Sequence, residues 1–469
     1  MKKTLLSFTT LLSLSVISFA QTDWSSIKTI DSDPGENPYT IASGMINADA
    51  YPDLVVGTYF GDKVLLYLNN GDGTFASAVE IATINEPNYI AIADVDGVNG
   101  NDIIVTSYTG GKIVWYANNG SGSFSSTENV ISSSVAGAGS IYAGLIDGDS
   151  FIDIAVSAYS GNKVVWFSNN GTGTFGSEQT INGSITEPGD FDMKDFDGDG
   201  DLDAVLSTSE WAAGVVDVYY NDLIPGGTVS FTVDANNVSD TGNTYLYDVD
   251  FVDVDNDGAL DILVSDSYGD FAWYKKEMAG TYTKTVITST IPNPGISEVA
   301  DMDNDGLNDI ILSNGATAGD DIVWMKSLGT PPTTLDVQTT IDGSGIQKQV
   351  YAMTIADFDN DGDLDIASLS YQVPSDGVYW FENLLETLEV PENVLSNEVN
   401  IYPNPTSNYI SFKGITSESI NVTVYDILGK QIINQTLNVN DTLDVSKLQN
   451  GIYILKLENS DVSYRFVKE

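Results

Sequence analysis

The chain has 469 residues, and its 67 Asp and Glu against 18 Lys and Arg give a formal net charge of −49. Such a surface repels nucleic acid and anionic membranes, so we expect neither as a partner. The chain contains no Cys and no His, which excludes disulfides and, in practice, zinc, copper and iron–sulfur sites.

The N-terminus has the layout of a cleavable secretory signal. Lys2 and Lys3 precede an apolar stretch that ends in Ser-Phe-Ala at residues 18–20. We therefore expect residues 1–20 to be a signal peptide, whose removal leaves a mature chain of net charge −51. No later segment holds the ~20 consecutive apolar residues of a membrane helix, so we expect no membrane span in the mature chain. A metal is the natural cross-link for an exported chain without disulfides.

A nine-residue pattern, D-x-D-x-D-G-x-x-D, recurs along the chain. Four copies carry Asp at positions 1, 3, 5 and 9 and Gly at position 6. They are Asp195, Asp197, Asp199 and Asp203; Asp253, Asp255, Asp257 and Asp261; Asp301, Asp303, Asp305 and Asp309; and Asp357, Asp359, Asp361 and Asp365.

Three earlier copies are degraded, because Met45, Val98 and Leu145 each stand where the pattern has an acid. The polar residues that they retain are Asn47, Asp49 and Asp53; Asp94, Asp96 and Asp102; and Asp147, Asp149 and Asp153. The last Asp recurs every 48 to 58 residues through all seven copies, a period typical of propeller blades.

Each loop lies between two predicted strands, and the second is a continuous apolar run such as residues 310–312. A third strand follows, and Asn-Asn-Gly turns then lead to fourth strands that we expect to begin near residues 76, 125 and 176. The pattern predicts an all-β fold, a seven-bladed β-propeller with four-stranded blades over residues 21–385. The seventh repeat lacks its own fourth strand, and residues 24–30 resemble one. We therefore expect the N-terminal strand to complete the last blade and close the ring.

The clustered carboxylates predict bound cations, because like charges this close repel one another unless a cation lies between them. The ligands are all hard oxygens, which favours Ca²⁺ as a structural cofactor, although some loops could instead be solvated acidic turns. An EF-hand opens with the same spacing but requires Glu at position 12 and flanking helices. Position 12 is Leu206, Val264, Leu312 and Ser368 in the four complete copies, and the flanks predict strands. An ion in all seven loops would change the net charge from −51 to −37.

The repeats resemble the FG-GAP or VCBS repeats of bacterial secreted proteins, which are similar to the calcium-binding blades of integrin α-chain propellers. This resemblance covers roughly residues 24–385. Residues 386–398 predict a linker, and residues 399–469 predict a separate small β-sandwich with turns at Gly429 and Gly451.

The C-terminal module has three landmarks, namely residues 399–405, 426–430 and 448–453. With these it resembles the type A sorting domain of the type IX secretion system of Bacteroidetes. The resemblance implies that the type IX secretion machinery is a partner. It also implies that the protein is secreted or attached to the outer membrane at the cell surface.

No catalytic site is predicted. The single Arg is Arg465, in the sorting domain, and no His is present, so a lyase would have few groups for its chemistry. Acids are plentiful enough for a carboxylate-pair glycosidase, but no pair stands apart from the candidate calcium ligands. We expect a binding or adhesion module for an extracellular glycan or protein ligand, and not an enzyme. The alternative is a surface polysaccharide-degrading enzyme, either a lyase or a glycoside hydrolase.

Five Trp recur at one strand position in successive repeats: Trp115, Trp166, Trp273, Trp324 and Trp380. Such regularity predicts packing between blades, with an aromatic platform for sugar rings as the alternative. Trp211 lies outside the series and is the Trp that we expect to be an exposed contact.

Overall fold

The computed structural model of the chain describes residues 22–210, 214–236, 238, 245–288, 291, 293–315, 322–327, 339–342, 346–347, 349–371, 376–385, 400–413, 419–426, 430–438, 441–457 and 463–469. The expected signal peptide and linker, Trp211 and the turn at Gly429 lie outside these residues. The chain divides into two compact units, Met1–Glu386 and Thr387–Glu469. Each unit is described by itself.

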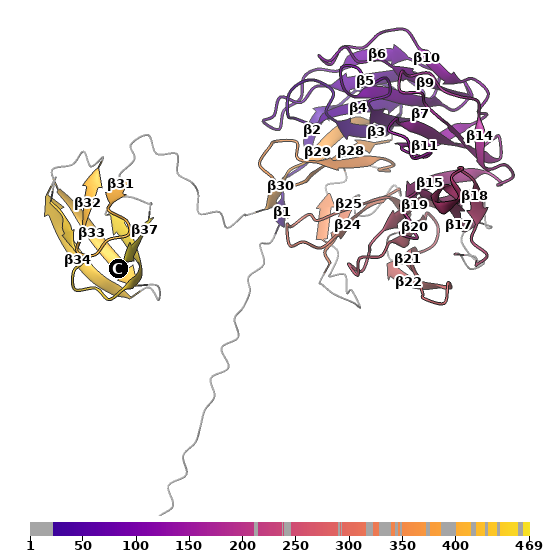
Figure 1. The fold of residues 1–469 in the computed structure, drawn as a ribbon. Helices are drawn as coiled ribbons and strands as arrows, with labels where there is room; N and C mark the ends of the chain where they lie inside the picture. The colour runs from indigo at the N-terminus through magenta and orange to yellow at the C-terminus, as the bar shows by residue number, and fades with distance from the viewer. Residues whose placement is uncertain are drawn as a thin grey trace, which may run out of the picture. The chain divides into compact units, whose positions relative to one another are not determined.

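The first unit is a ring of seven four-stranded antiparallel sheets, which confirms the predicted seven-bladed propeller (Figure 1). Six blades use four strands in chain order. They are β3 (Pro38–Gly44), β4 (Asp53–Thr58), β5 (Lys63–Tyr67) and β6 (Val79–Thr83); β7 (Pro87–Ala93), β8 (Asp102–Ser107), β9 (Lys112–Tyr116) and β10 (Asn129–Ser132); β11 (Ala138–Gly144), β12 (Asp153–Ala158), β13 (Lys163–Phe167) and β14 (Gln179–Asn182); β15 (Pro188–Lys194), β16 (Asp203–Thr208), β17 (Val216–Asn221) and β18 (Phe231–Val233); β19 (Leu246–Val252), β20 (Asp261–Asp266), β21 (Phe271–Lys276) and β22 (Tyr282–Thr288); and β23 (Pro294–Ala300), β24 (Asp309–Asn314), β25 (Ile322–Met325) and β26 (Thr339–Asp342).

The seventh blade takes its outer strand from the N-terminus, as the sequence predicted. It consists of β27 (Met353–Ala356), β28 (Asp365–Ser370), β29 (Gly377–Phe381) and β2 (Lys28–Asp31). In this pairing Lys28 lies opposite Trp380. The preceding strand β1 (Thr22–Trp24) pairs with β30 (Asn383–Leu385) just beyond the blade. The edge of β29 is therefore covered, which closes the ring at its seam.

Three outer strands begin later than expected, at Val79, Asn129 and Gln179 rather than near residues 76, 125 and 176. An isolated bridge joins the first Asn of each Asn-Asn-Gly turn to a Phe six residues on, for example Asn69 to Phe75. The chain therefore closes a small loop before it enters the outer strand.

The core lies between the blades. The second strands β4, β8, β12, β16, β20, β24 and β28 are buried along their whole length. Trp115 is 5% exposed and packs with Ile154 of the next blade, and Trp166, Trp324 and Trp380 lie in similar shared clusters. Trp273 is partly buried. The Trp series therefore packs neighbouring blades together, as predicted.

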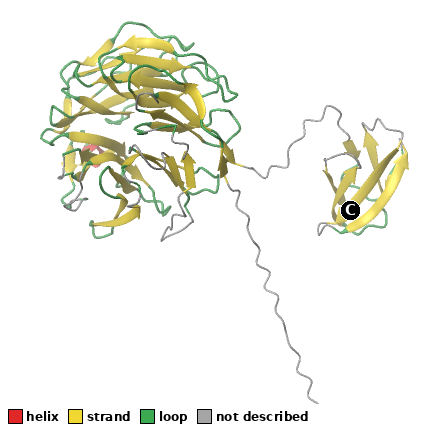
Figure 2. Cartoon of the chain, turned by 180° about the vertical axis from the view of Figure 1, so that it is seen from behind, coloured by secondary structure: helices red, strands yellow, loops and turns green. Residues whose placement is uncertain are grey.

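Loops and strands make up almost all of the described part of the first unit, where the one helix, α1 (Leu223–Gly226), is a single turn between β17 and β18 (Figure 2). Among the described residues, no helix has both the length and the apolar character needed to cross a membrane.

The second unit is a small β-sandwich, as predicted. One sheet contains β31 (Asn400–Tyr402), β32 (Tyr409–Lys413) and β35 (Leu443–Asp444), and the other contains β34 (Gln431–Asn438), β33 (Ser419–Asp426), β36 (Gly451–Leu457) and β37 (Ser463–Lys468). The two sheets share a core in which Ile410 and Leu443 pack with Val422, Val424 and Leu455.

Candidate metal loops and central cavity

The seven nine-residue patterns form the connections between the first and second strands of the blades, and we call them the aspartate loops: 45–53, 94–102, 145–153, 195–203, 253–261, 301–309 and 357–365. The Asp at position 9 starts the second strand and is buried in every blade. One carboxylate oxygen of this Asp accepts the backbone N–H of position 2, for example from Ile146 to Asp153 at 3.1 Å.

The other carboxylate oxygen of position 9 ties the loop to the end of the third strand. Asp153 accepts the backbone N–H of Asn169 at 2.8 Å. Five other blades repeat the contact, with Asn69, Asn118, Asn221, Ser327 and Asn383 as donors. Burial raises the pKa of Asp153 to about 6, because the charged form is desolvated. Position 9 is therefore a structural brace, in addition to its candidacy as a metal ligand.

Position 6 explains why the four complete loops bend alike. Gly200, Gly258, Gly306 and Gly362 have φ between 87° and 102°, a conformation that a side chain would strain. In each loop this Gly donates its backbone N–H to the Asp at position 1, at 2.8 to 3.1 Å. The bend folds the loop back on itself, so that alternate carboxylates point inward.

Five of the loops bring three carboxylates together, with ligand oxygens within 4.8 Å of one another. The converging groups are Asp94, Asp96 and Asp102; Asp195, Asp197 and Asp199; Asp253, Asp255 and Asp261; Asp301, Asp303 and Asp309; and Asp357, Asp359 and Asp361. The degraded loop 94–102 is thus as convergent as the complete ones. In the described part of the chain, Asp147, Asp149 and Asp153 form no such group. The loop 45–53 has only two acids, Asp49 and Asp53, beside Asn47.

The donor set of the convergent loops fits a hard divalent cation. All the side-chain donors are carboxylate oxygens, which Ca²⁺ and Mg²⁺ prefer. In the loop 357–365, Oδ1 of Asp359 is buried and accepts no hydrogen bond from any described residue, although a buried acceptor normally has a partner. A bound cation would supply that partner and would cancel the repulsion among the three acids.

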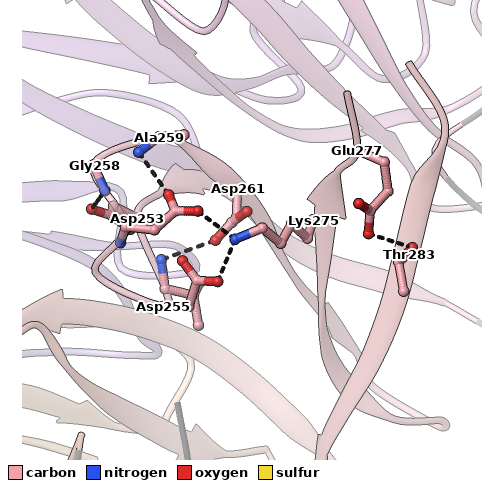
Figure 3. Close-up of polar contacts among 10 residues, drawn as sticks. Asp253, Asp255, Gly258, Ala259, Asp261, Lys275, Glu277 and Thr283 are labelled. Atoms are coloured by element: carbon pink, nitrogen blue, oxygen red, sulfur yellow. Dashed lines mark hydrogen bonds and ion pairs between the residues drawn. The ribbon is translucent and has the colours of Figure 1, made fainter. Parts of the chain in front are cut away.

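Two complete loops already contain a cationic side chain, which the sequence did not lead us to expect. The ammonium of Lys275, at the end of β21, contacts the carboxylates of Asp255 and Asp257 (Figure 3). The Lys275 contact holds the pKa of Asp257 below its usual value. The ammonium of Lys326 contacts Asp303 and lies 3.1 Å from Asp305 in the next blade.

The second candidate site is a cavity of about 630 Å³ to which all seven blades contribute, and we call it the central cavity. Neighbouring first strands contact one another around the whole ring, so this cavity lies where the blades meet. Its wall is rich in tyrosine, and Phe60 and Tyr268 at the same cavity are 58% and 57% exposed.

The tyrosines of the central cavity form a connected series of rings. Tyr108 contacts Tyr159 and Tyr59, with ring centroids 6.2 and 6.4 Å apart. From Tyr59 the series continues through Tyr39 to Tyr351, at 5.4 and 6.4 Å. Aromatic side chains in contact at these distances form an extended apolar surface with hydroxyl groups along it.

The sequence contains a signal for this wall that composition and motif reading missed. Tyr59, Tyr108, Tyr159 and Tyr371 each stand six residues after the position-9 Asp of their blade. Each follows directly after its second strand, at the opposite end from the aspartate loop. The chain therefore carries two aromatic series with the blade period: the Trp series, which is packed in the core, and this Tyr series, which lines the cavity.

A second cavity of about 450 Å³ shares Tyr39, Tyr89, Asp190 and Tyr247 with the first and is strongly acidic. Its carboxylate and ammonium groups belong to Asp190, Asp192, Lys194, Asp248, Asp250 and Glu298, from the first strands β15, β19 and β23. We call these six residues the acidic floor.

The acidic floor contains one cation against five acids. Lys194 lies 3.0 Å from Asp192. Ser297 donates both its backbone N–H and its hydroxyl to Asp248, at 2.7 and 2.6 Å. Burial raises the pKa of Glu298 to about 7 and that of Asp190 to about 6. Because five acids outnumber one Lys, the floor favours neutral or cationic groups over anions at pH values where the acids are ionised.

Two sequence families match the chain. The FG-GAP-like repeat matches residues 46–97, 99–156, 146–206, 195–264, 253–312 and 301–368, and the secretion system C-terminal sorting domain matches residues 400–468. An endo-acting ulvan lyase of Formosa agariphila is 27% identical over 101 residues, which are 21% of this chain and 19% of that protein. The chain thus matches about a fifth of the length of this relative.

Two solved structures resemble the fold. The first, of BBS1N in complex with ARL6DN, has a TM-score of 0.50 at 12% identity and covers 78% of this chain and 98% of the other. The second, of an Agrocybe aegerita lectin that recognises non-reducing terminal N-acetylglucosamine, has a TM-score of 0.48 at 17% identity and covers 66% and 81%. The repeat family spans most of the chain, and the sorting domain marks it for secretion to the medium or the cell surface. The chain therefore belongs to the FG-GAP-like repeat proteins.

Proposed function

We propose that this protein is a calcium-binding extracellular propeller that acts as a binding or adhesion module for a carbohydrate or protein ligand, without catalytic activity. The observation that carries the proposal is the tyrosine wall of the central cavity, that is, the connected rings of Tyr39, Tyr59, Tyr108, Tyr159 and Tyr351. The contact between Tyr39 and Tyr351 links the first blade to the seventh. Ligand sites are typically concave, largely apolar and aromatic, with a few polar groups that fix orientation. The central cavity has that composition and draws residues from all seven blades.

Calcium fits the aspartate loops in a structural role. The convergent loops lie at the start of the second strands, whereas Tyr59, Tyr108 and Tyr159 of the cavity wall follow the ends of those strands. An ion in a loop would hold a first strand to a second strand without contacting the ligand. Calcium removal would therefore lower stability first and ligand binding only as a consequence.

The charge of the acidic floor makes some ligands of the cavities more favourable than others. Asp190, Asp248, Asp250 and Glu298 line the second cavity, which shares tyrosines with the central cavity, and Lys194 is the one cation in the described part of this lining. Sulfated or uronate polysaccharides would meet carboxylates there, so neutral sugars or protein segments with basic side chains are the better ligands.

A polysaccharide-degrading enzyme is the second candidate, and one observation favours it. Burial raises the pKa of Glu298 to about 7, so this carboxyl group stays partly protonated near neutral pH, as a general acid must be. A lyase acting on uronates has less support, because the described lining of the two cavities contains one Lys and no Arg.

One pair of measurements on the secreted protein tests both candidates. Binding to neutral glycans or to basic peptides on an array, with no product formed after prolonged incubation, supports the binding module. New reducing ends or unsaturated uronates released from algal or plant polysaccharides would overturn it and establish the enzyme.

A further inference from the structure

The starting observation is a position that faces the aspartate loop in every blade. In each blade the residue after the position-9 Asp pairs with the third strand, as Ile262 pairs with Tyr274 and Ile310 with Met325. The next residue of the third strand therefore lies opposite the position-9 Asp, and we call it the loop-facing position. In chain order the seven blades place there Leu68, Ala117, Ser168, Tyr220, Lys275, Lys326 and Glu382.

In four blades a polar group at this position approaches the loop, whereas the hydroxyl of Tyr220 donates instead to Asp234 at 2.8 Å. The hydroxyl of Ser168 donates to Asp147 at 2.8 Å. Lys275 contacts the acids at positions 3 and 5 of its loop, and Lys326 contacts the acids at the same two positions of the next loop. The carboxyl group of Glu382 lies within hydrogen-bonding distance of that of Asp359.

The lysines coincide with a change in which carboxylates converge. In the complete loops without lysine, the group consists of positions 1, 3 and 5, for example Asp195, Asp197 and Asp199. In the two complete loops with lysine, it consists of positions 1, 3 and 9, and the acid at position 5, Asp257 or Asp305, is left out. The ammonium group in each of these loops lies between the omitted acid at position 5 and the retained acid at position 3.

We propose that Lys275 and Lys326 are tethered cations that replace calcium in blades five and six. This inference rests on the proposal that the other complete loops, 195–203 and 357–365, bind calcium. An ammonium group offers three donors, enough to bridge the facing carboxylates. The ammonium group is part of the chain, so placing it in the loop does not cost the translational entropy that a free ion loses on binding. An incoming Ca²⁺ would have to displace it and would then remain beside a like charge.

Blade seven carries the opposite charge at the same position. Glu382 brings an additional carboxylate to a loop that already has five Asp, and Lys28 from the N-terminal strand pairs with it. The complete loops thus divide into two that carry their own cation and two that require one from solution.

The test compares the wild-type full chain with Lys275→Met, Lys326→Met and with the charge-matched control Lys112→Met, Lys163→Met. Lys112 and Lys163 begin third strands at the end away from the loops and pair with Glu128 and Glu178. Equilibrium dialysis should show about two more calcium ions per chain for the first variant than for the wild type or the control. In EGTA the first variant should melt roughly 2–4 °C below the control.

Two outcomes distinguish this inference from the proposal on which it rests. If the wild type binds calcium and the variant gains none, the lysines do not exclude the ion and the inference fails. If no protein binds calcium, the calcium proposal fails, and equal melting in EGTA would then also refute the tethered cations.

A measurement on the wild type covers the case in which the variant does not fold. Acetylation of surface amines, read by peptide mass spectrometry, should leave Lys275 and Lys326 equally protected with and without calcium. Modification that rises when calcium is added would show that the ion displaces the ammonium groups, and would overturn the inference.

Discussion

Asp153 and Asn169 are joined by a hydrogen bond of 2.8 Å in which the backbone N–H of Asn169 donates to the carboxylate. The bond links the start of the second strand to the residue just beyond the third strand. The same bond recurs in six blades. The last Asp of the repeat thus has a structural role even where the loop has lost other acids.

Replacing Asp153 by Ala should therefore destabilise the protein in the absence of calcium. The substitution removes the acceptor for the buried N–H groups of Ile146 and Asn169, and such losses cost about 2–4 kcal/mol in total. Asp149→Ala, at an exposed position of the same loop, should cost about 0.5 kcal/mol or less. Urea unfolding in EGTA measures the free energy of unfolding of both variants. Equal losses of stability would contradict a structural role of Asp153 as the brace between the loop and the third strand.

Calcium removal should lower the melting temperature of the wild type. At a free concentration 100 times its Kd, an ion that binds only the folded state stabilises that state by about 2.7 kcal/mol. Asp359→Asn, in a convergent loop, should reduce the difference between the melting temperatures in calcium and in EGTA. Asp149→Asn should leave that difference unchanged. Superimposable thermal melts in calcium and in EGTA would rule out the metal scheme.

Deleting residues 22–31 should open the propeller at its seam. The deletion removes β1 and β2 and exposes the edge of β29, so melting should occur at a lower temperature and association between chains should increase. A chain that ends at Glu386 is the control, because it lacks only the second compact unit. Light scattering during a thermal melt reports both effects, and identical behaviour of the two truncations would argue against closure by the N-terminus.

Substitutions in the tyrosine wall should weaken ligand binding without unfolding the blades. Tyr108→Ala and Tyr159→Ala each remove a ring from the series, and we expect a loss of about tenfold in affinity for each, which corresponds to about 1.4 kcal/mol. Tyr409→Ala, an exposed position in the sorting domain, is the matched control. Titration with whichever glycan or peptide the array identifies gives the affinities. Unchanged binding by both wall variants would place the ligand elsewhere.

Stability should depend on pH through the acidic floor. The pKa of Glu298 is about 7 in the folded protein against 4.5 in a free side chain. Between these values the folded state holds more protons than the unfolded state, so its stability falls as the pH rises from about 4.5 to 7. Glu298→Gln removes the buried charge and should raise stability at pH 8 by up to about 3 kcal/mol, with little effect at pH 4.5.

The control for that prediction is Glu36→Gln, at an exposed position of the propeller. Chemical denaturation of both variants at pH 4.5 and pH 8 isolates the contribution of the floor. A stabilisation by Glu298→Gln that is the same at both pH values would come from packing rather than from charge.

The repeated features of this protein could be predicted from the sequence because they are encoded locally. The spacing of aspartates such as Asp203 and Asp261 marks one turn per blade, and the apolar runs that follow them mark the buried second strands. Counting these units was enough to predict seven blades. The last repeat lacks a fourth strand of its own, which predicted that residues near Ile30 supply the outer strand of the last blade.

The central cavity could not be predicted in this way, because its residues come from every blade and meet only when the ring closes. The same holds for the second cavity, where Asp190 and Glu298 are more than 100 residues apart in the chain and nothing in their local sequence marks them as neighbours. The part played by Lys275 depends likewise on the register between β20 and β21, which sets Lys275 opposite Asp261. Spacing along the chain specifies strands and turns, whereas contacts between distant residues arise from strand pairing and ring closure.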